Sequence, residues 1–215
     1  EMYGDQLIVF PLGFTPPEQT WTNEPIETLE DIEGLKIRAA GLSTDLWEAL
    51  GASPVLLPGG EVVPSLQRGV VDAVEFTFPS MDVPLGLPDV ATYVYGPPLH
   101  MGANMFQLII NPEKWAELPD DLKSIVENAA IAASSEGYAL EWIETMEYFE
   151  QMRNNPDLTI DTLSPEIQRT ARDLTYEILE RRSQEDEFFA KVWESQRSFL
   201  EQFEPYDEFT SFDFE

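Results

Sequence analysis

An arginine and a glutamate stand where two short apolar segments of the chain end. Arg38 lies near the end of the segment 36–40, and Glu75 with Phe76 ends the segment 70–76. A guanidinium fork binds a carboxylate through paired hydrogen bonds, and carboxylate oxygens bind hard cations. These residues therefore predict an anion-binding arginine, with a cation that offsets the charges of Glu75 and of a bound carboxylate. A plain ion pair between Arg38 and Glu75, holding two strands together, explains the same residues equally well.

Other chemistry finds little support in the residue types. Cysteine is absent, which excludes disulfides and thiol catalysis, and His100 is the only histidine. A lone histidine makes no convincing zinc site and indicates a hydrogen-bonded structural residue. Gly59-Gly60 opens a predicted helix and can offer backbone N–H groups to an anion, although a tight turn explains it as well. Carboxylate pairs for glycoside hydrolysis arise by chance among 41 acidic residues.

The elements around Arg38 and Glu75 alternate between strand and helix. Ser43 is a suitable cap for the first of these helices. Such alternation predicts a parallel sheet with helices on its faces, and ligands bind beyond the carboxyl ends of parallel strands. The strands are predicted at 36–40, 54–58 and 70–76, and the helices at 43–50 and 60–67.

The flanking segments of the first half carry weaker patterns. Residues 7–12 predict a short strand, and the stretch 13–25 is rich in turn residues. Residues 79–98 contain many prolines and are expected to be mostly irregular. Residues 104–110 are predicted to form another buried strand.

The second half is predicted to be mainly helical. Apolar residues recur at helical spacing over 119–153, a helix on the order of 50 Å long that must bridge two bodies or pack against a partner. A short strand at 158–163 and a helical tract over 164–203 follow. We therefore expect an α/β ligand-binding lobe over 1–111. Residues 112–215 would supply the linking helix, a short strand and C-terminal helices that complete the other lobe.

Charge excludes one class of partner. The chain has 41 acidic and 12 basic residues, a net charge of −29, whereas nucleic-acid binding requires clustered Lys and Arg. Such an excess of acidic residues favours a halophilic source, because salt screens the repulsion among them.

No window approaches the roughly 20 apolar residues of a membrane span, which predicts a soluble chain. The chain opens at Glu1 without a leader pattern, so a leader has been removed or the chain begins partway through a longer protein.

Three segments together resemble the DctP family, the solute-binding subunits of TRAP transporters. They are Ile-Glu-Gly-Leu-Lys-Ile-Arg-Ala-Ala-Gly at 32–41, Leu-Gly-Ala-Ser-Pro-Val at 50–55, and the segment 57–73 with its Pro-Gly-Gly-Glu start. With Val-Glu-Phe at 74–76, the chain looks most like the branch that binds 2-oxo acids or related carboxylates with a metal ion. The resemblance extends over about residues 7–207.

The resemblance implies a fold and a set of site residues. The fold would be α/β and two-lobed, of the periplasmic-binding-protein type (type II-like), with a long interlobe helix. Arg38 takes the place of the carboxylate-binding arginine, and Glu75 that of the acid that ligates the cation, Na⁺ or Ca²⁺, beside the substrate. Phe76 stands where the branch has Trp, whose backbone carbonyl also ligates the metal, so that ligand is retained while the pocket wall changes.

The chain also departs from the family pattern. The glutamine that precedes the branch's tryptophan, here Trp21, aligns with Pro17, and Gln19 takes its role only if the loop shifts. The acid or amide that usually follows His100 is replaced by Met101, although His100 stays a candidate pocket residue. The N-terminal portion of one lobe is expected to be missing.

These observations favour a binding protein over two alternatives. It would be extracytoplasmic or periplasmic, capture a small carboxylate (a 2-oxo acid, hydroxy acid or dicarboxylate), deliver it to TRAP membrane permease subunits, and catalyse no reaction. A homodimer through the C-terminal helices is a further expectation. The alternatives are a carboxylate-dependent hydrolase or lyase, and a helical assembly module without a small ligand.

Overall fold

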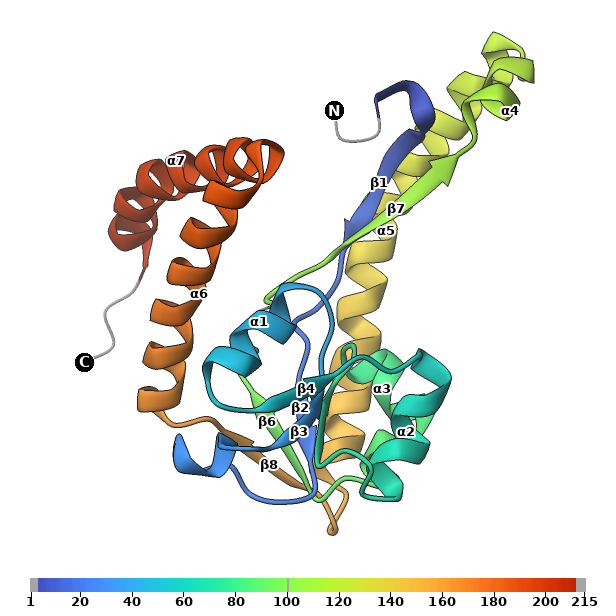
Figure 1. Cartoon of the computed structure of the whole chain (residues 1–215). Coiled ribbons are helices and arrows are strands. Elements are labelled where there is room, and N and C mark those ends of the chain that lie inside the picture. The colour runs from blue at the N-terminus through green and yellow to red at the C-terminus, as the bar shows by residue number, and fades with distance from the viewer. Residues whose placement is uncertain (1–3, 100, 212–215) are drawn as a thin grey trace.

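The computed structural model describes residues 4–99 and 101–211. Its main element is a mixed six-stranded sheet, seen near the base of Figure 1. The strand order is β4-β3-β5-β2-β6-β8. β3 is parallel to β4 and β5, β2 is antiparallel to β5 and β6, and β6 is parallel to β8. The strands are β2 (Thr20–Thr22), β3 (Lys36–Arg38), β4 (Ser53–Val55), β5 (Ala73–Glu75), β6 (Tyr93–Gly96) and β8 (Thr159–Thr162).

Helices cover both faces of this sheet. One face packs on α1 (Leu42–Ala49) and α6 (Pro165–Glu185), around a core that includes Ile37, Trp47 and Ile167. The opposite face packs on α2 (Gly59–Gln67) and the end of α5 (Asp120–Arg153), around Trp21 and Val74. Successive strand residues point to opposite faces of a sheet, so Ala73 and Val74 enter different cores.

The predicted alternation over residues 36–76 is confirmed. The strands β3, β4 and β5 are parallel, and α1 and α2 connect them. One local detail was wrong: Ser43 is not the cap of α1. Gly41 occupies that position with φ of 63°, a conformation that favours glycine, and Ser43 lies buried inside the helix.

Two segments expected to be irregular contain regular elements. The turn-rich stretch 13–25 includes β2, whose three residues are buried in the middle of the sheet. The proline-rich stretch 79–98 includes α3 (Pro79–Leu85) and the buried strand β6. Pro79 occupies the first turn of α3, where a missing N–H costs nothing. The strands β2 and β6 were missed because three or four residues are too few to display a period.

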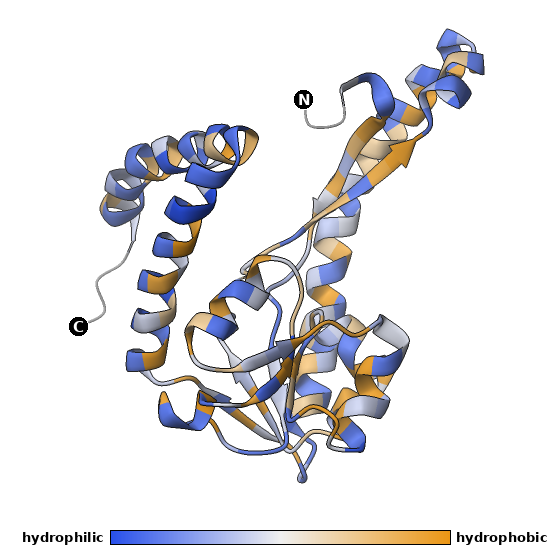
Figure 2. Cartoon of the chain, viewed as in Figure 1, coloured by the Kyte–Doolittle hydropathy of each residue, from blue (hydrophilic) through white to orange (hydrophobic). Residues whose placement is uncertain are grey.

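A separate two-stranded sheet runs along the long helix. β1 (Ile8–Phe14) pairs antiparallel with β7 (Met105–Ile110), with a register shift between Pro11 and Gly13. This ribbon lies against α5, as Figure 1 shows. The strand predicted at 104–110 therefore exists, but the expectation that it is buried was wrong, since its residues are exposed or half-exposed. Figure 2 shows apolar residues along both strands.

The second half supplies the long helix and an arm of two helices. α5 has 34 residues, and the short helix α4 (Pro112–Glu117) precedes it. α7 (Glu187–Thr210) folds back on α6 after a break at Asp186, whose carboxylate accepts from the N–H of Phe189 and caps α7. β8 follows α5 and pairs with β6, so the sheet draws strands from both sides of residue 111. The domain boundary there stays a prediction.

Candidate ligand-binding site

The carboxyl ends of β3 and β5 and the start of β2 meet at one edge of the sheet. Thr20 pairs with Glu75, and Arg38 pairs with Val74. Because β2 runs antiparallel to β5, its first residues lie at the same edge as the last residues of β5. The fold therefore brings the segment around Gln19 to the edge where Arg38, Glu75 and Phe76 lie.

Arg38 is half-buried at this edge and bound on several sides. Its Nη1 donates to the backbone carbonyl of Glu75 at 2.7 Å, and its Nε lies 3.5 Å from the carbonyl oxygen of Leu57. The guanidinium also stacks over the Phe76 ring, 5.0 Å from its centroid, an attractive cation–π arrangement. Arg38 thus holds the end of β5 through its main chain and its aromatic neighbour.

The electrostatics around Arg38 are dominated by acids. Burial lowers the pKa of the guanidinium, while the charges of Glu18, Glu75 and Asp82 act to raise it. The group stays protonated, as arginine does in proteins. The carboxylates of Glu18, Glu75 and Asp82 together carry more negative charge than the one guanidinium offsets. This excess favours binding of a cation at this edge, and it opposes binding of an anion alone.

Glu75 points to the other side of the sheet from Arg38 and Phe76. Its side chain is almost fully buried, and one carboxylate oxygen accepts a short hydrogen bond from the Ser43 hydroxyl on α1. Strand alternation explains this division, since neighbouring residues of a strand face opposite sides. The Ser43 contact was missed from the sequence, where Ser43 was interpreted as a helix cap.

Gln19 carries an oxygen without a partner among the described residues. Its amide nitrogen donates to the carbonyl of Pro17 at 2.7 Å, and its Oε1 is buried and accepts no hydrogen bond. Buried acceptors are normally paired, so this oxygen suits a ligand or a cation. The hydrogen bond also ties the Gln19 side chain to Pro17, the position expected to correspond to the family's glutamine.

Helix α2 completes the wall behind Phe76. A Cβ built on Gly59 would meet the Phe76 ring at 3.1 Å, whereas one on Gly60 would meet nothing within 4 Å. Glycine at 59 thus permits the ring to lie close to the start of α2. The pair Gly59-Gly60 was expected to offer N–H groups to an anion or form a turn, and its visible role here is packing.

Sequence analysis missed Asp82, which lies close to this edge on α3. Its carboxylate is fully buried and accepts from the Trp21 indole N–H at 2.8 Å and from the Thr77 hydroxyl. Burial raises the pKa of Asp82 to about 6, against the effect of these hydrogen bonds. The only sequence signal was Pro79 three residues earlier, which marks a helix start. His100, the remaining candidate, lies outside the described residues.

An apolar cavity borders the cluster, between α1 and α6. Its volume is about 300 Å³, and its lining is almost entirely apolar. Ser43, which bonds Glu75, lies on one side, and Met101, whose carbonyl accepts from the Glu18 N–H at 3.2 Å, lies on another. The lining residues are Ala40, Gly41, Leu42, Ser43, Leu46, Met101, Thr175, Ile178 and Leu179.

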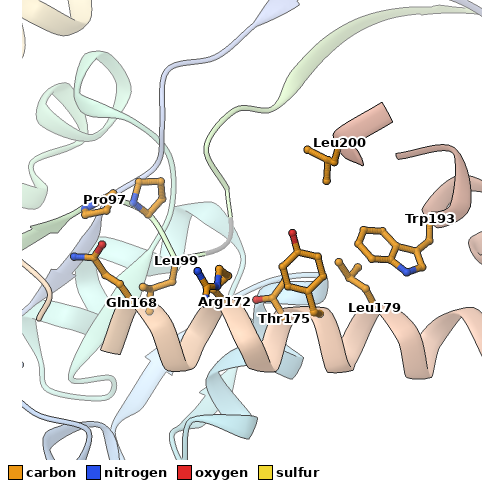
Figure 3. A pocket seen from close by; sticks show the side chains of 10 residues that line it. Pro97, Leu99, Gln168, Arg172, Thr175, Leu179, Trp193 and Leu200 are labelled. Carbon is orange, nitrogen blue, oxygen red and sulfur yellow. The ribbon is translucent and has the colours of Figure 1, made fainter. Parts of the chain in front are cut away.

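A second pocket lies on the arm, away from these residues. It has a volume of about 350 Å³ and opens between α6, α7 and residues 97–99 (Figure 3). Figure 3 shows Thr175 and Leu179 on α6 facing Trp193 and Leu200 on α7. Among its described lining residues, none is Gln19, Arg38, Glu75 or Phe76.

Solved structures of TRAP periplasmic solute-binding proteins share this fold. The protein of Pseudoalteromonas atlantica, with bound sodium and pyruvate, aligns over 99% of this chain and 67% of its own, with a TM-score of 0.89 and 28% identity. That of Colwellia psychrerythraea, with bound calcium and pyruvate, aligns over 97% and 64%, with a TM-score of 0.89 and 25% identity. The chain therefore has the α/β fold of the two-lobed periplasmic binding proteins.

Sequence comparison assigns the family. Residues 17–186 match the DctP family, described as bacterial extracellular solute-binding protein, family 7, and the chain belongs to this family. The monocarboxylate 2-oxoacid-binding periplasmic protein of Nostoc sp. is 28% identical over 205 residues, or 91% of this chain. The chain spans 54% of that relative's length.

Sodium and calcium, the cations bound in those two solved structures, both require oxygen donors. In residues 4–99 and 101–211, no group of three or more His, Asp and Glu side chains is arranged to hold a metal. Hard cations also accept amide and backbone oxygens, and the buried, unpartnered Oε1 of Gln19 is such a donor. Glu75, the Phe76 carbonyl and Gln19 offer a carboxylate and two neutral oxygens, which are the donor types that Na⁺ and Ca²⁺ accept.

Proposed function

We propose that this protein is the extracytoplasmic solute-binding subunit of a TRAP-type transporter, located in the periplasm and working with membrane permease subunits. In this proposal it captures a small carboxylate, with a 2-oxo acid as the preferred ligand, and binds without catalysing a reaction. The family assignment supports the class, and relatives with pyruvate or 2-oxoacids in their names support the ligand.

The observation that carries this proposal is Arg38 at the carboxyl end of β3. A half-buried guanidinium there, held by the Glu75 carbonyl and stacked on Phe76, is pre-oriented for a carboxylate. The surrounding acids oppose anion binding unless a cation offsets them. A Na⁺ or Ca²⁺ ion bound by Glu75, the Phe76 carbonyl and Gln19 would bridge protein and substrate.

The cavity between α1 and α6 supports a monocarboxylate over a dicarboxylate. None of its described lining residues is charged, and burying an unpaired carboxylate there would be costly. The cavity lies on the Ser43 side of the sheet, so a ligand whose carboxylate binds Arg38 would have to extend past the strand ends to place an aliphatic end in it. Among the classes considered, a 2-oxo acid with a short alkyl chain fits best.

Binding to an Arg38 variant tests the proposal. Calorimetry on the full-length protein, with Ca²⁺ or Na⁺ present, should detect pyruvate or a longer 2-oxo acid. Arg38→Ala should weaken this binding by roughly 100-fold, the loss of a charge-assisted pair, while Arg38→Lys should fall between. Arg153→Ala is the control, because Arg153 pairs with exposed Glu150 at the end of α5.

Two outcomes would sink this proposal. Equal binding of carboxylates by wild type and folded Arg38→Ala would remove the arginine from the site. Turnover of a carboxylate by the wild type, abolished in a variant that still binds it, would favour the hydrolase or lyase reading.

We also propose a homodimer through the C-terminal helices. α7 exposes Phe199, Phe203, Tyr206 and Phe209, and the pocket beside α6 lies next to them. A patch of aromatic side chains of this kind is typical of an association surface. Light scattering should report twice the monomer mass, and Phe203→Glu should return it to the monomer. A monomeric wild type at every concentration would refute the dimer.

A further inference from the structure

Asp82 on α3 carries a carboxylate that is fully buried in the protein. Its side chain is 0% exposed, and it receives the Trp21 indole N–H at 2.8 Å together with the Thr77 hydroxyl. Burying a charge without strong compensation is expensive, so a group of this kind indicates a specific role. Arg38 acts on it only as a weaker, more distant charge.

The two partners of Asp82 flank the oxygens assigned to the binding site. Trp21 is on β2 and lies two residues after Gln19, which directly precedes that strand. Thr77 directly follows Phe76, just after the end of β5. β2 and β5 are neighbours in the sheet. One carboxylate thus connects the two chain segments that carry the Gln19 amide and the Phe76 carbonyl, just where their ladder of backbone hydrogen bonds ends.

Helix α3 is itself fixed from the other side by the long helix. The Ser80 hydroxyl, two residues before Asp82, donates to a carboxylate oxygen of Glu141 on α5. The Thr145 hydroxyl, also on α5, lies 3.3 Å from the Ser80 hydroxyl. A chain of side-chain contacts therefore runs from α5 through α3 to the two segments at the binding edge.

We propose that Asp82 is a positioning residue, whose carboxylate sets the distance and orientation between the Gln19 and Phe76 oxygens of the binding site. This inference rests on the proposed function and goes beyond it, because Asp82 is fully buried and acts through Trp21 and Thr77. Loss of the two acceptor oxygens of Asp82 frees both segments. The Gln19 side-chain oxygen and the Phe76 carbonyl oxygen are then no longer held at a fixed distance from each other.

Binding of pyruvate in the presence of Ca²⁺ by full-length variants tests the proposal. Asp82→Ala should weaken pyruvate binding at least tenfold. Asp82→Asn keeps an acceptor oxygen for the Trp21 indole but turns an NH2 donor toward the donating Thr77 hydroxyl and backbone N–H, so its pyruvate binding should lie between those of Asp82→Ala and the wild type. Asp89→Asn is the exposed control on the turn after α3. Ile167→Ala, which opens a cavity in the opposite core, controls for loss of stability alone.

Pyruvate binding is compared among the variants under conditions where each variant is folded. Pyruvate binding by Asp82→Ala within threefold of the wild type would overturn the inference. An equal loss of binding in Ile167→Ala would overturn it as well, since the effect would then be one of general stability.

A second readout needs no ligand and separates this inference from the proposed function. In nuclear magnetic resonance spectra, Asp82→Ala should shift the Trp21 indole, Gln19 side-chain amide and Phe76 backbone amide signals, and Asp89→Asn should not. If the wild type binds no pyruvate, the assigned ligand is wrong, and these signals still decide the role of Asp82. Unmoved Gln19 and Phe76 signals would refute it.

Discussion

At the scale of single residues, the burial of Asp82 has a measurable effect on stability. Its pKa is raised to about 6 by burial from an ordinary value of 3.8. An acid whose pKa is raised on folding stabilises the folded state at pH values below its unfolded pKa, and that contribution disappears as the pH rises through the folded pKa. The relevant window is therefore about pH 4 to 6.

Comparison with Asp82→Asn isolates this effect from the other acids. The free energy of unfolding of the wild type minus that of Asp82→Asn should fall by about 3 kcal/mol, at most, between pH 4 and pH 7. Urea unfolding at several pH values measures the difference. A difference that stays constant over this range would show that Asp82 titrates alike in the folded and unfolded chains.

The paired glycines at the start of α2 allow a second residue-level test. Gly59→Ala should push the Phe76 ring away from its position under Arg38, because the new Cβ would approach the ring to 3.1 Å. Pyruvate binding should weaken by about three- to tenfold, on the scale of a lost cation–π contact. Gly60→Ala, with open space around it, should bind as the wild type does. Equal binding by both variants would contradict this packing role.

Residue-level prediction from sequence succeeded where the residues ended parallel strands. Arg38 and Glu75 were placed at one sheet edge because parallel strands bring their carboxyl ends together. Arg38 holds the end of β5 through the Glu75 backbone carbonyl, which resembles the expected link between two strands, and the anion-binding role of Arg38 stays a prediction. Asp82 and the Ser43–Glu75 bond could not be predicted, since they depend on where α3 and α1 pack.

At the scale of elements, β1 and α5 approach each other unusually closely. Gly13 has φ of 109°, and a Cβ at this position would lie 2.9 Å from the backbone oxygen of Ser134 on α5. Gly13→Ala should therefore destabilise the protein by about 2 kcal/mol or more, through backbone strain and a clash that main-chain atoms cannot easily relieve. Denaturant unfolding measures the change.

The same interface supplies the control. Gly137 on α5 faces the carbonyl oxygen of Leu12, and a Cβ there would lie at an ordinary 3.9 Å. Gly137→Ala should be neutral or stabilise the protein by about 0.5–1 kcal/mol, because alanine favours a helix interior. A loss of stability similar to that of Gly13→Ala would show that the interface is uniformly tight.

Element prediction depended on length. The 34-residue helix α5 spans enough turns for its period to be read directly, and its predicted bounds agree with the structure. β2, with three residues, displays no alternation and lies in a stretch of turn residues. Its central place in the sheet follows from pairing with β5 and β6, which no local pattern encodes.

At the scale of the whole molecule, the net charge of −29 predicts a dependence on salt. We propose that the protein comes from a halophilic source, since screening reduces repulsion among its acids. Its melting temperature should rise by several degrees or more between 0.1 and 2 M KCl. Sucrose at matched osmolarity controls for solute exclusion. A melting temperature indifferent to molar KCl would contradict the proposal.

The long helix α5 is held in the body of the protein at one end and projects from it at the other. Its last turns are anchored in the body, where Thr145 and Met152 are buried, while its first turns extend away from the sheet with β1 and β7 beside them. A helix of 34 residues is about 51 Å long. A tilt of about 10° at the anchored end displaces the far end by about 9 Å. A shift where α3 contacts α5 would therefore displace the far end of α5 by more than it displaces the anchored end.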